Sequence, residues 1–305
     1  MGSQNSGDDI AGTIHSVGSD VVGFHPGDRV AAFHEMRSAH GSFAEYALAK
    51  DYSTFHLPKK STFEEGAAIP LAAMTAAVGL FIRLGLPEPW QGAADGKVKD
   101  AERGQHRTGP LVVYGAASAV GAYTIQLAKH AGIGPIIAVA GKGIPFVKGF
   151  LDESAGDAIV DYRNGDEALV EGIKKALNGQ KLKYAYDAVS EKGSYQNLAK
   201  VLDLGSEGGE ARLTHVLPLD KDFKHEGLKT EWTMVGCVHG VPEMQSDFGQ
   251  AWFTLFGKGL KEGWFKAHPT ETVPGGLDGV ETGLRNLKEG KASAVKYVFK
   301  IGDTK

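Results

Sequence analysis

Apolar and polar positions follow two different spacings along the chain. From residue 111 to 239, short and nearly continuous apolar runs alternate with helical segments. Continuous runs of this kind are typical of strands that are buried on both faces of a sheet. We predict six strands, at 111–114, 136–139, 158–161, 184–187, 212–217 and 233–238. Repeated strand–helix units of this length predict an α/β fold with a doubly wound parallel sheet.

The segments between these strands have helical periodicity. The first one carries Val120, Thr124, Leu127 and Ala128 along one face, and Gly132 is expected to end it. Further helices are predicted at 145–153, 166–178 and 192–203, and after the sheet at 249–263 and 279–289. A last strand is predicted at 294–301.

The first hundred residues have a different pattern. Short strand-like runs at 10–17, 29–33 and 42–48 are separated by glycine and proline, which is typical of antiparallel or barrel-like structure. Residues 87–110 are polar and rich in glycine, so we expect a surface loop before the parallel sheet.

The most informative motif is the loop Gly-Ala-Ala-Ser-Ala-Val-Gly, from Gly115 to Gly121, between the first strand of the sheet and the helix that follows. A helix N-terminus offers unpaired N–H groups and a partial positive charge to a pyrophosphate. Small side chains allow the backbone to approach the phosphates closely. The alternative is an ordinary tight turn of an α/β protein, and the repeated strand–helix units around the loop favour a dinucleotide site of the Rossmann type.

The residues at the end of the second strand indicate which of the two nicotinamide cofactors the chain prefers. NAD-binding proteins usually have an acidic residue there for the ribose hydroxyls. This chain has Gly141 and Lys142 instead, and a lysine suits the extra phosphate of NADPH. We therefore predict NADPH as the cofactor. Lys148 could take the same role, and a solvated surface lysine is the alternative for Lys142.

Composition narrows the possible functions. A net charge of −4 gives no basic surface for nucleic acid or an anionic membrane, and no apolar stretch is long enough for a membrane span. The one cysteine, Cys237, excludes an internal disulfide framework and a multi-cysteine zinc site. A cytoplasmic location is expected.

Several phrases together resemble one family. They are G-D-D-I-A-G at 7–12, P-G-D-R-V at 26–30, G-S-F-A-E-Y at 41–46, A-A-I-P at 67–70 and the loop at 113–121. The set is similar to the zinc-free quinone oxidoreductases and fungal trans-acting enoyl reductases of the medium-chain dehydrogenase/reductase superfamily. The resemblance implies a GroES-like catalytic domain at 7–71, a Rossmann NADP-binding domain at 72–240, and a C-terminal return to the catalytic domain at 241–305.

The chain departs from this family in two places. Zinc alcohol dehydrogenases have Gly-His-Glu where this chain has Gly7-Asp8-Asp9, and only His34, Glu35 and His40 are nearby donors, so no metal is expected. Family members also have further barrel strands before the phrase at Gly7. The resemblance therefore implies an incomplete GroES-like β-barrel whose first strand has an open edge.

The resemblance also assigns roles to individual residues. It places Ala117, Ser118, Ala119 and Val120, within the Gly115–Gly121 loop, on the pyrophosphate, and Gly141, Lys142 and Tyr162 around the adenosine phosphate. Leu217, Pro218, Val295 and Lys296 would border the cofactor, and Thr75 would lie near the nicotinamide as the catalytic position. The alternatives are a strand-end aromatic for Tyr162 and a helix cap for Thr75.

The expected function is an NADPH-dependent oxidoreductase that delivers hydride, without zinc, to a small molecule, a quinone or an α,β-unsaturated carbonyl. Two alternatives stay open: a trans-acting enoyl reductase of polyketide biosynthesis, and a catalytically impaired NADPH-binding protein. We expect a monomer or a homodimer that binds neither nucleic acid nor membrane.

Overall fold

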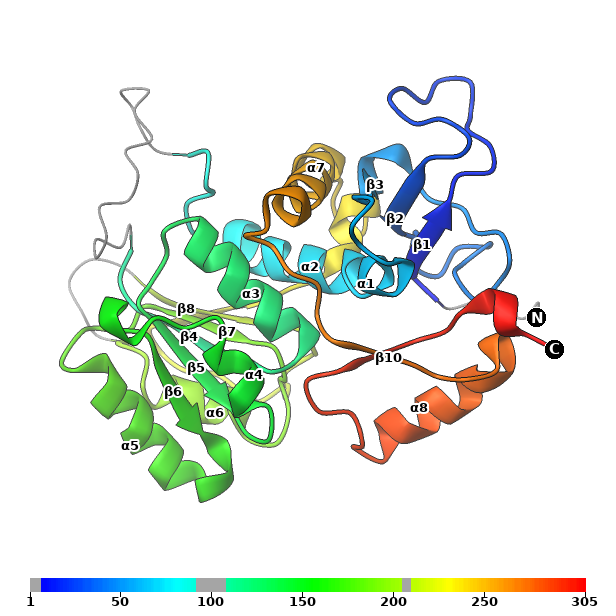
Figure 1. Ribbon diagram of the computed structural model, residues 1–305. Helices are drawn as coiled ribbons and strands as arrows, with labels where there is room; N and C mark the ends of the chain where they lie inside the picture. The colour runs from blue at the N-terminus through cyan, green and yellow to red at the C-terminus, as the bar shows by residue number, and fades with distance from the viewer. Residues whose placement is uncertain (1–6, 92–107, 205–209) are drawn as a thin grey trace. The chain divides into compact units, whose positions relative to one another are not determined.

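The chain forms two compact units. The computed structural model describes residues 7–91, 108–204 and 210–305 (Figure 1). One unit comprises 75–233, and the other combines 1–74 with 234–305. The predicted loop at 87–110 lies partly outside the described residues.

The unit at 75–233 is built on a six-stranded sheet. Its strands are β4 (Leu111–Tyr114), β5 (Ile136–Ala140), β6 (Ala158–Asp161), β7 (Tyr184–Asp187), β8 (Ala211–His215) and β9 (Leu228–Trp232). All neighbours are parallel, and the spatial order is β6-β5-β4-β7-β8-β9. In chain order this is 3-2-1-4-5-6, the Rossmann arrangement, so the predicted α/β fold class is confirmed. The strand order reverses between β4 and β7, which is where such sheets bind ligands.

Helices pack against the sheet because its central strands are apolar on both faces. They are α3 (Ala119–His130), α4 (Ile144–Lys148), α5 (Asp166–Leu177) and α6 (Ser194–Ala199), with short 3-10 turns at Glu153–Ala155 (η3) and Tyr162–Asn164 (η4). Helices α5 and α6 share one core with Val112 and Val139 of the sheet. Tyr186 faces the other side of the sheet. It donates a hydrogen bond to the carbonyl of Thr75 in α2 (Pro70–Ala77), at 2.8 Å. The π-helical segment η2 (Val78–Arg83) follows, and a Cβ at Gly79 would lie 2.3 Å from the Tyr186 ring.

The prediction of the sixth strand was wrong. The strand is β9, and the apolar run at 233–238 forms mainly a 3-10 helix, η5 (Val235–His239). Strand β9 lies at the sheet edge and is mostly exposed, so its sequence Leu-Lys-Thr-Glu-Trp lacks the apolar pattern of a buried strand. Residues Val235 to Val238 are buried all round, and periodicity does not separate a buried helical turn from a buried strand. Two predicted helices, at 145–153 and 192–203, are shorter than expected.

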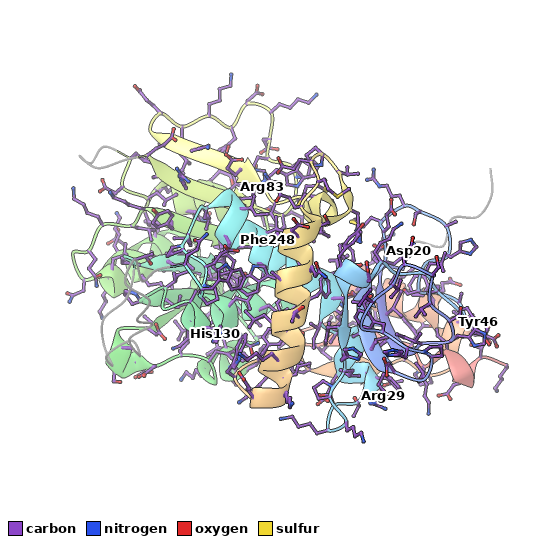
Figure 2. All side chains as sticks on the ribbon, turned by 90° about the horizontal axis from the view of Figure 1, so that it is seen from above. Asp20, Arg29, Tyr46, Arg83, His130 and Phe248 are labelled. Atoms are coloured by element: carbon purple, nitrogen blue, oxygen red, sulfur yellow. The ribbon has the colours of Figure 1, made fainter. Side chains whose placement is uncertain are left out.

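The other unit contains small sheets and longer helices. Strands β1 (Asp9–Thr13), β2 (Arg29–Phe33) and β3 (Thr54–His56) pair antiparallel in that order, and β10 (Thr270–Thr272) pairs in parallel with β11 (Lys296–Val298). The helices are α1 (Phe63–Ala67), α7 (Ser246–Glu262) and α8 (Val280–Lys288), with 3-10 turns η1 (Asp51–Ser53), η6 (Gly276–Gly279) and η7 (Ile301–Asp303). Helix α7, which carries Phe248 (Figure 2), buries Trp252, Phe253 and Phe256. Phe253 lies against Phe55, and Phe256 stacks on Phe265.

The prediction of a strand at 42–48 was also wrong. This segment forms bends, with isolated hydrogen bonds from Ser42 N to Gly7 O and from Leu48 N to His40 O. Tyr46 and Leu48 are 65% and 62% exposed, so the apolar positions that suggested a strand are not buried. The third strand of the sheet lies further along the chain, at β3.

Candidate cofactor-binding site

The loop between β4 and α3 leaves the first backbone N–H groups of α3 available to a ligand. Gly115 has a φ of +76°, and the Ser118 hydroxyl caps α3 by accepting a hydrogen bond from Gly121 N at 3.0 Å. The N–H groups of Ala119 and Val120, in the first turn of the helix, have no intrahelical acceptor. These groups and the positive end of a 12-residue helix make the carboxyl end of β4 favourable for an anion.

Two glycines make this loop tight. A Cβ at Gly121 would lie 2.3 Å from the carbonyl oxygen of Gly115, and a Cβ at Gly115 would lie 2.6 Å from the side chain of Val189. Ala117 and Ser118 between them are small and half-buried. The backbone is therefore open to a bulky anion, and the loop fits a dinucleotide pyrophosphate.

The carboxyl ends of β5 and β6 bring the predicted adenosine residues together. The ring of Tyr162 lies over Gly141, where a Cβ would be 2.8 Å from the ring, and stacks on Tyr114 with the centroids 6.3 Å apart. Lys142 is exposed between two buried glycines, and the ion pairs found among the described residues include neither Lys142 nor Lys148.

A second cation at this edge is already neutralised. Arg163 forms an ion pair with Asp161 at 2.5 Å, and the hydrogen bonds from Arg163 hold the pKa of Asp161 at about 2. Lys142 is consequently the better candidate for an added phosphate.

Sequence reasoning missed the buried Asp187 at the end of β7. Its carboxylate accepts hydrogen bonds from Val189 N at 2.9 Å, Ser190 N at 2.8 Å and Ser194 Oγ at 2.5 Å. Burial raises the pKa of Asp187, and these bonds oppose the rise. The signal was available in the sequence, because an aspartate followed by small residues after a strand is typical of a side-chain-stabilised turn.

The same turn holds the loop after β8. Ser190 Oγ accepts from Val216 N at 2.9 Å, and a ring nitrogen of His215 lies 2.7 Å from the carbonyl of Leu217. Leu217 and Pro218 are exposed after this point. The loops after β4, β7 and β8 therefore meet at one edge of the sheet.

The remaining predicted residues lie elsewhere. Thr75 is buried within α2, where its carbonyl accepts from Tyr186, so its side chain is not at the start of a helix. Val295 and Lys296 belong to the other compact unit, and Lys296 forms an ion pair with Asp9 there. The structure thus brings the β4 loop, Gly141, Lys142, Tyr162, Leu217 and Pro218 together in one unit, and assigns Val295 and Lys296 to the other.

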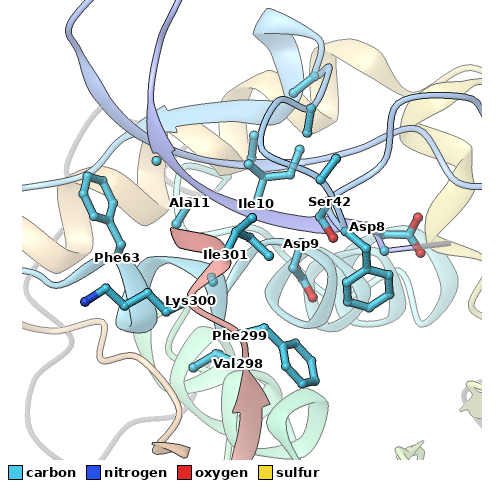
Figure 3. Close-up of a pocket in the computed structure, with 18 of the residues that line it drawn as sticks. Asp8, Asp9, Ile10, Ala11, Ser42, Phe63, Val298, Phe299, Lys300 and Ile301 are labelled. Atoms are coloured by element: carbon cyan, nitrogen blue, oxygen red, sulfur yellow. The ribbon is translucent and has the colours of Figure 1, made fainter. Parts of the chain in front are cut away.

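The unit formed by 1–74 and 234–305 has a cavity of about 650 Å³ beside the outer edge of β1 (Figure 3). Ile10 and Ala11 line it together with Phe299 and Ile301 from the end of the chain. Within the described residues, strand β1 pairs with β2 on its other side and with no further strand. The cavity is mostly apolar and contains none of the predicted pyrophosphate residues.

His34, one of the metal donors considered in the sequence, is engaged in hydrogen bonds. Both ring nitrogens of His34 face hydrogen-bond partners, the carbonyl of Leu48 at 2.6 Å and the hydroxyl of Ser38 at 3.1 Å. Burial raises the pKa of Asp8 to about 6. Across 7–91, 108–204 and 210–305, no three His, Cys, Asp or Glu side chains are grouped to hold a metal ion. The helices in these ranges are also too short or too polar to cross a membrane.

A Rossmann sheet with a glycine-lined loop at its switch point, in a chain whose other unit holds small sheets, is typical of two-unit oxidoreductases that bind a nicotinamide cofactor. Comparison with known proteins agrees. Residues 4–59 match the alcohol dehydrogenase GroES-like domain. The chain is 46% identical over 273 residues to trans-enoyl reductase fsr4 of Gibberella fujikuroi, covering 89% of this chain and 75% of that protein. It is 30% identical to trans-enoyl reductase resD of Aspergillus sclerotiorum, covering 97% and 85%.

Solved structures share the fold at low sequence identity. A putative zinc-dependent alcohol dehydrogenase from Rhizobium etli has a TM-score of 0.75 at 18% identity, covering 95% of this chain and 79% of that one. The CurK enoyl reductase has a TM-score of 0.66 at 16% identity, covering 95% and 78%. The chain belongs to the medium-chain dehydrogenase/reductase superfamily, in its enoyl-reductase-like branch. The predicted family is therefore confirmed, including its GroES-like domain.

Proposed function

We propose that the protein is an NADPH-dependent trans-acting enoyl reductase, which reduces the C=C bond of an α,β-unsaturated thioester made by a polyketide synthase. Two relatives that cover most of the chain are named trans-enoyl reductases. This similarity favours enoyl reduction over quinone reduction, the function expected first from the sequence. The anion site of the β4–α3 loop is the observation that carries the proposal, because hydride transfer needs a bound dinucleotide.

The residues of the Rossmann unit act in cofactor binding and orientation. The backbone of Ala119 and Val120 holds the pyrophosphate, and Lys142 holds the ribose phosphate of NADPH next to Tyr162. Leu217 and Pro218 border the cofactor, and Val295, Lys296 and Thr75 keep the roles that the resemblance implies. Hydride addition to the β-carbon, the chemistry that a bound nicotinamide supplies, leaves negative charge on the carbonyl oxygen. Hydrogen-bond donors stabilise that charge without a metal.

A substrate comparison tests the proposal. The purified protein is assayed with the N-acetylcysteamine thioester of crotonic acid and with menadione, each with NADPH and with NADH. We expect turnover of the thioester with NADPH, and kcat/KM at least about tenfold higher than for menadione or with NADH. Turnover of menadione alone would show a quinone reductase. NADPH binding without turnover of either compound would show a non-catalytic NADPH-binding protein. A cytoplasmic location and a monomeric or homodimeric state stay predictions.

A further inference from the structure

Ser190 has a backbone conformation that residues other than glycine rarely adopt. It lies in the turn after β7, within the unit at 75–233, and its φ is 60°, in the left-handed region. The residue is only 4% exposed, so this conformation is fixed inside the fold. Glycine adopts such a backbone freely, whereas a Cβ destabilises it, and strain of this kind is concentrated at functional sites. A serine at this position therefore calls for a use of its hydroxyl.

The Ser190 hydroxyl joins two loops at the carboxyl edge of the sheet. Its oxygen accepts a hydrogen bond from Val216 N at 2.9 Å and donates one to the carbonyl of Asp187 at 3.2 Å. Asp187 is the last residue of β7, and Val216 directly follows β8. Glycine at 190 would relieve the backbone strain and would also remove this link between the two loops. The link is the use that explains a strained serine here.

The backbone after β8 is held by further side chains. The indole Nε1 of Trp232, at the end of β9, donates to the carbonyl of Val216 at 3.3 Å. A ring nitrogen of His215 lies 2.7 Å from the carbonyl of Leu217. Both polar groups of the Val216 residue are thus bonded to side chains from neighbouring strands, and the exposed Leu217 and Pro218 follow at a fixed place.

This loop belongs to the half of the sheet that lies opposite the predicted adenosine residues. A Rossmann sheet combines two mononucleotide-binding halves, which meet here between β4 and β7. Gly141, Lys142 and Tyr162 lie in the half formed by β4, β5 and β6. The segment 216–218 lies in the half formed by β7, β8 and β9. With the adenosine in the first half, the second half is left for the nicotinamide nucleotide.

We propose that Ser190 is a positioning residue for the nicotinamide half of NADPH, because its hydroxyl holds the loop at 216–218 in place against that half of the cofactor. This inference rests on the proposed function, which requires the dinucleotide at this edge of the sheet. Ser190 acts through the Val216 backbone, and Leu217 and Pro218 supply the surface that borders the cofactor. The adenosine half does not depend on this link, so loss of the hydroxyl should affect the two halves differently.

Two substitutions separate the hydroxyl from the backbone strain. Ser190→Gly removes the hydroxyl and relieves the strain, whereas Ser190→Ala removes the hydroxyl and keeps the strain. Lys192→Gly is the matched control, because Lys192 lies in the same turn with a φ of 54° and an exposed side chain. Four quantities are measured in the full chain: the Tm, the hydrogen exchange of the Val216 amide, and the Kd of NADPH and of adenosine 2′,5′-bisphosphate, which is the adenosine half alone.

We expect Ser190→Gly to raise the Kd of NADPH about three- to tenfold, the scale of one neutral hydrogen bond, and to leave that of the bisphosphate within about twofold. The Val216 amide should exchange faster, and the Tm should change little because relief of strain offsets the lost hydrogen bonds. Ser190→Ala should raise the Kd of NADPH equally with a lower Tm, and Lys192→Gly should keep both Kd values within about twofold of wild type.

An unchanged Kd of NADPH in Ser190→Gly, or an equal rise for both ligands, would overturn the inference, since a general loss of structure affects both halves. Failure of the proposed function is a separate result. It would appear as wild-type protein that binds NADPH but does not reduce the crotonyl thioester, and the comparison of Kd values would still decide the role of Ser190. Wild-type protein that binds no NADPH would overturn both.

Discussion

Replacing Gly121 with alanine tests the cofactor site most directly. The new Cβ would lie 2.3 Å from the carbonyl oxygen of Gly115 and 2.8 Å from the Cα of Ala116. Both are backbone atoms, so a side-chain rotation cannot relieve the contact. The loop has to move away from α3 by about 1 Å to reach an ordinary contact distance. That movement takes the phosphate out of line with the N–H groups of the first helical turn.

The cost can be worked from these contacts. A hydrogen bond to a charged group contributes about 1.5–3 kcal/mol, and weakening two of them costs about 3 kcal/mol. This corresponds to a roughly 100-fold higher Kd. NADPH and NADH should be affected equally, because both carry the pyrophosphate. Overpacking should also lower the free energy of unfolding by about 1–3 kcal/mol.

The assay is a fluorescence titration of each cofactor, together with denaturant unfolding. Gly149→Ala is the matched control, because Gly149 is exposed in the same unit and its nearest atom would lie at 3.4 Å from the new Cβ. We expect the control to stay within about 0.5 kcal/mol of wild type in stability and binding. Wild-type cofactor affinity in Gly121→Ala would refute the assignment of this loop to the pyrophosphate.

Four further predictions follow from the same structure. Lys142→Ala should raise the Kd of NADPH about 10- to 100-fold with little change for NADH, and equal losses for both would show that Lys142 does not bind the phosphate. Burial, helped by Lys296, lowers the pKa of His268 from 6.5 to about 4, so protonation favours the unfolded chain and stability should fall as the pH drops from 6.5 to 4. Unfolding titrations should show a smaller fall in His268→Phe, and an unchanged fall would assign it to other groups. Dialysis against a strong chelator should leave turnover unchanged, whereas loss that zinc alone restores would contradict the zinc-free mechanism. Hydrogen exchange should be fast across β1 and slow in β4 and β5; uniform protection would show that the β1 edge is not open.

The sequence predicted the parallel sheet well because its central strands are buried on both faces. Strands β4 and β5 are entirely buried, and their continuous apolar runs are each followed by a helical segment, as in a parallel sheet. The edge strand β9 was missed because three of its five positions, Lys229, Thr230 and Trp232, are exposed, so it lacks an apolar run. The apolar run at 233–238 was predicted to be a strand because a buried helical turn has the same apolar composition as a buried strand.

The candidate site could also be predicted from the sequence only in part. The loop from Gly115 to Gly121 and the pair Gly141 and Lys142 could be read locally, because they directly follow predicted strands. The contact of Tyr162 with Gly141 could not, since it depends on the register between β5 and β6.

The hydrogen bonds of Asp187 have a kinetic consequence. One buried carboxylate organises the turn after β7, and Ser190 in that turn holds the loop after β8. A further bond, from Ala188 N to Tyr114 O, ties the turn to the strand that leads into the phosphate loop. The surface that we propose for the dinucleotide is therefore ordered before a ligand arrives, and little binding energy should be spent on arranging it. Cofactor association in stopped flow should accordingly be a single exponential phase, whose rate rises linearly with concentration and does not saturate at a slow conformational step.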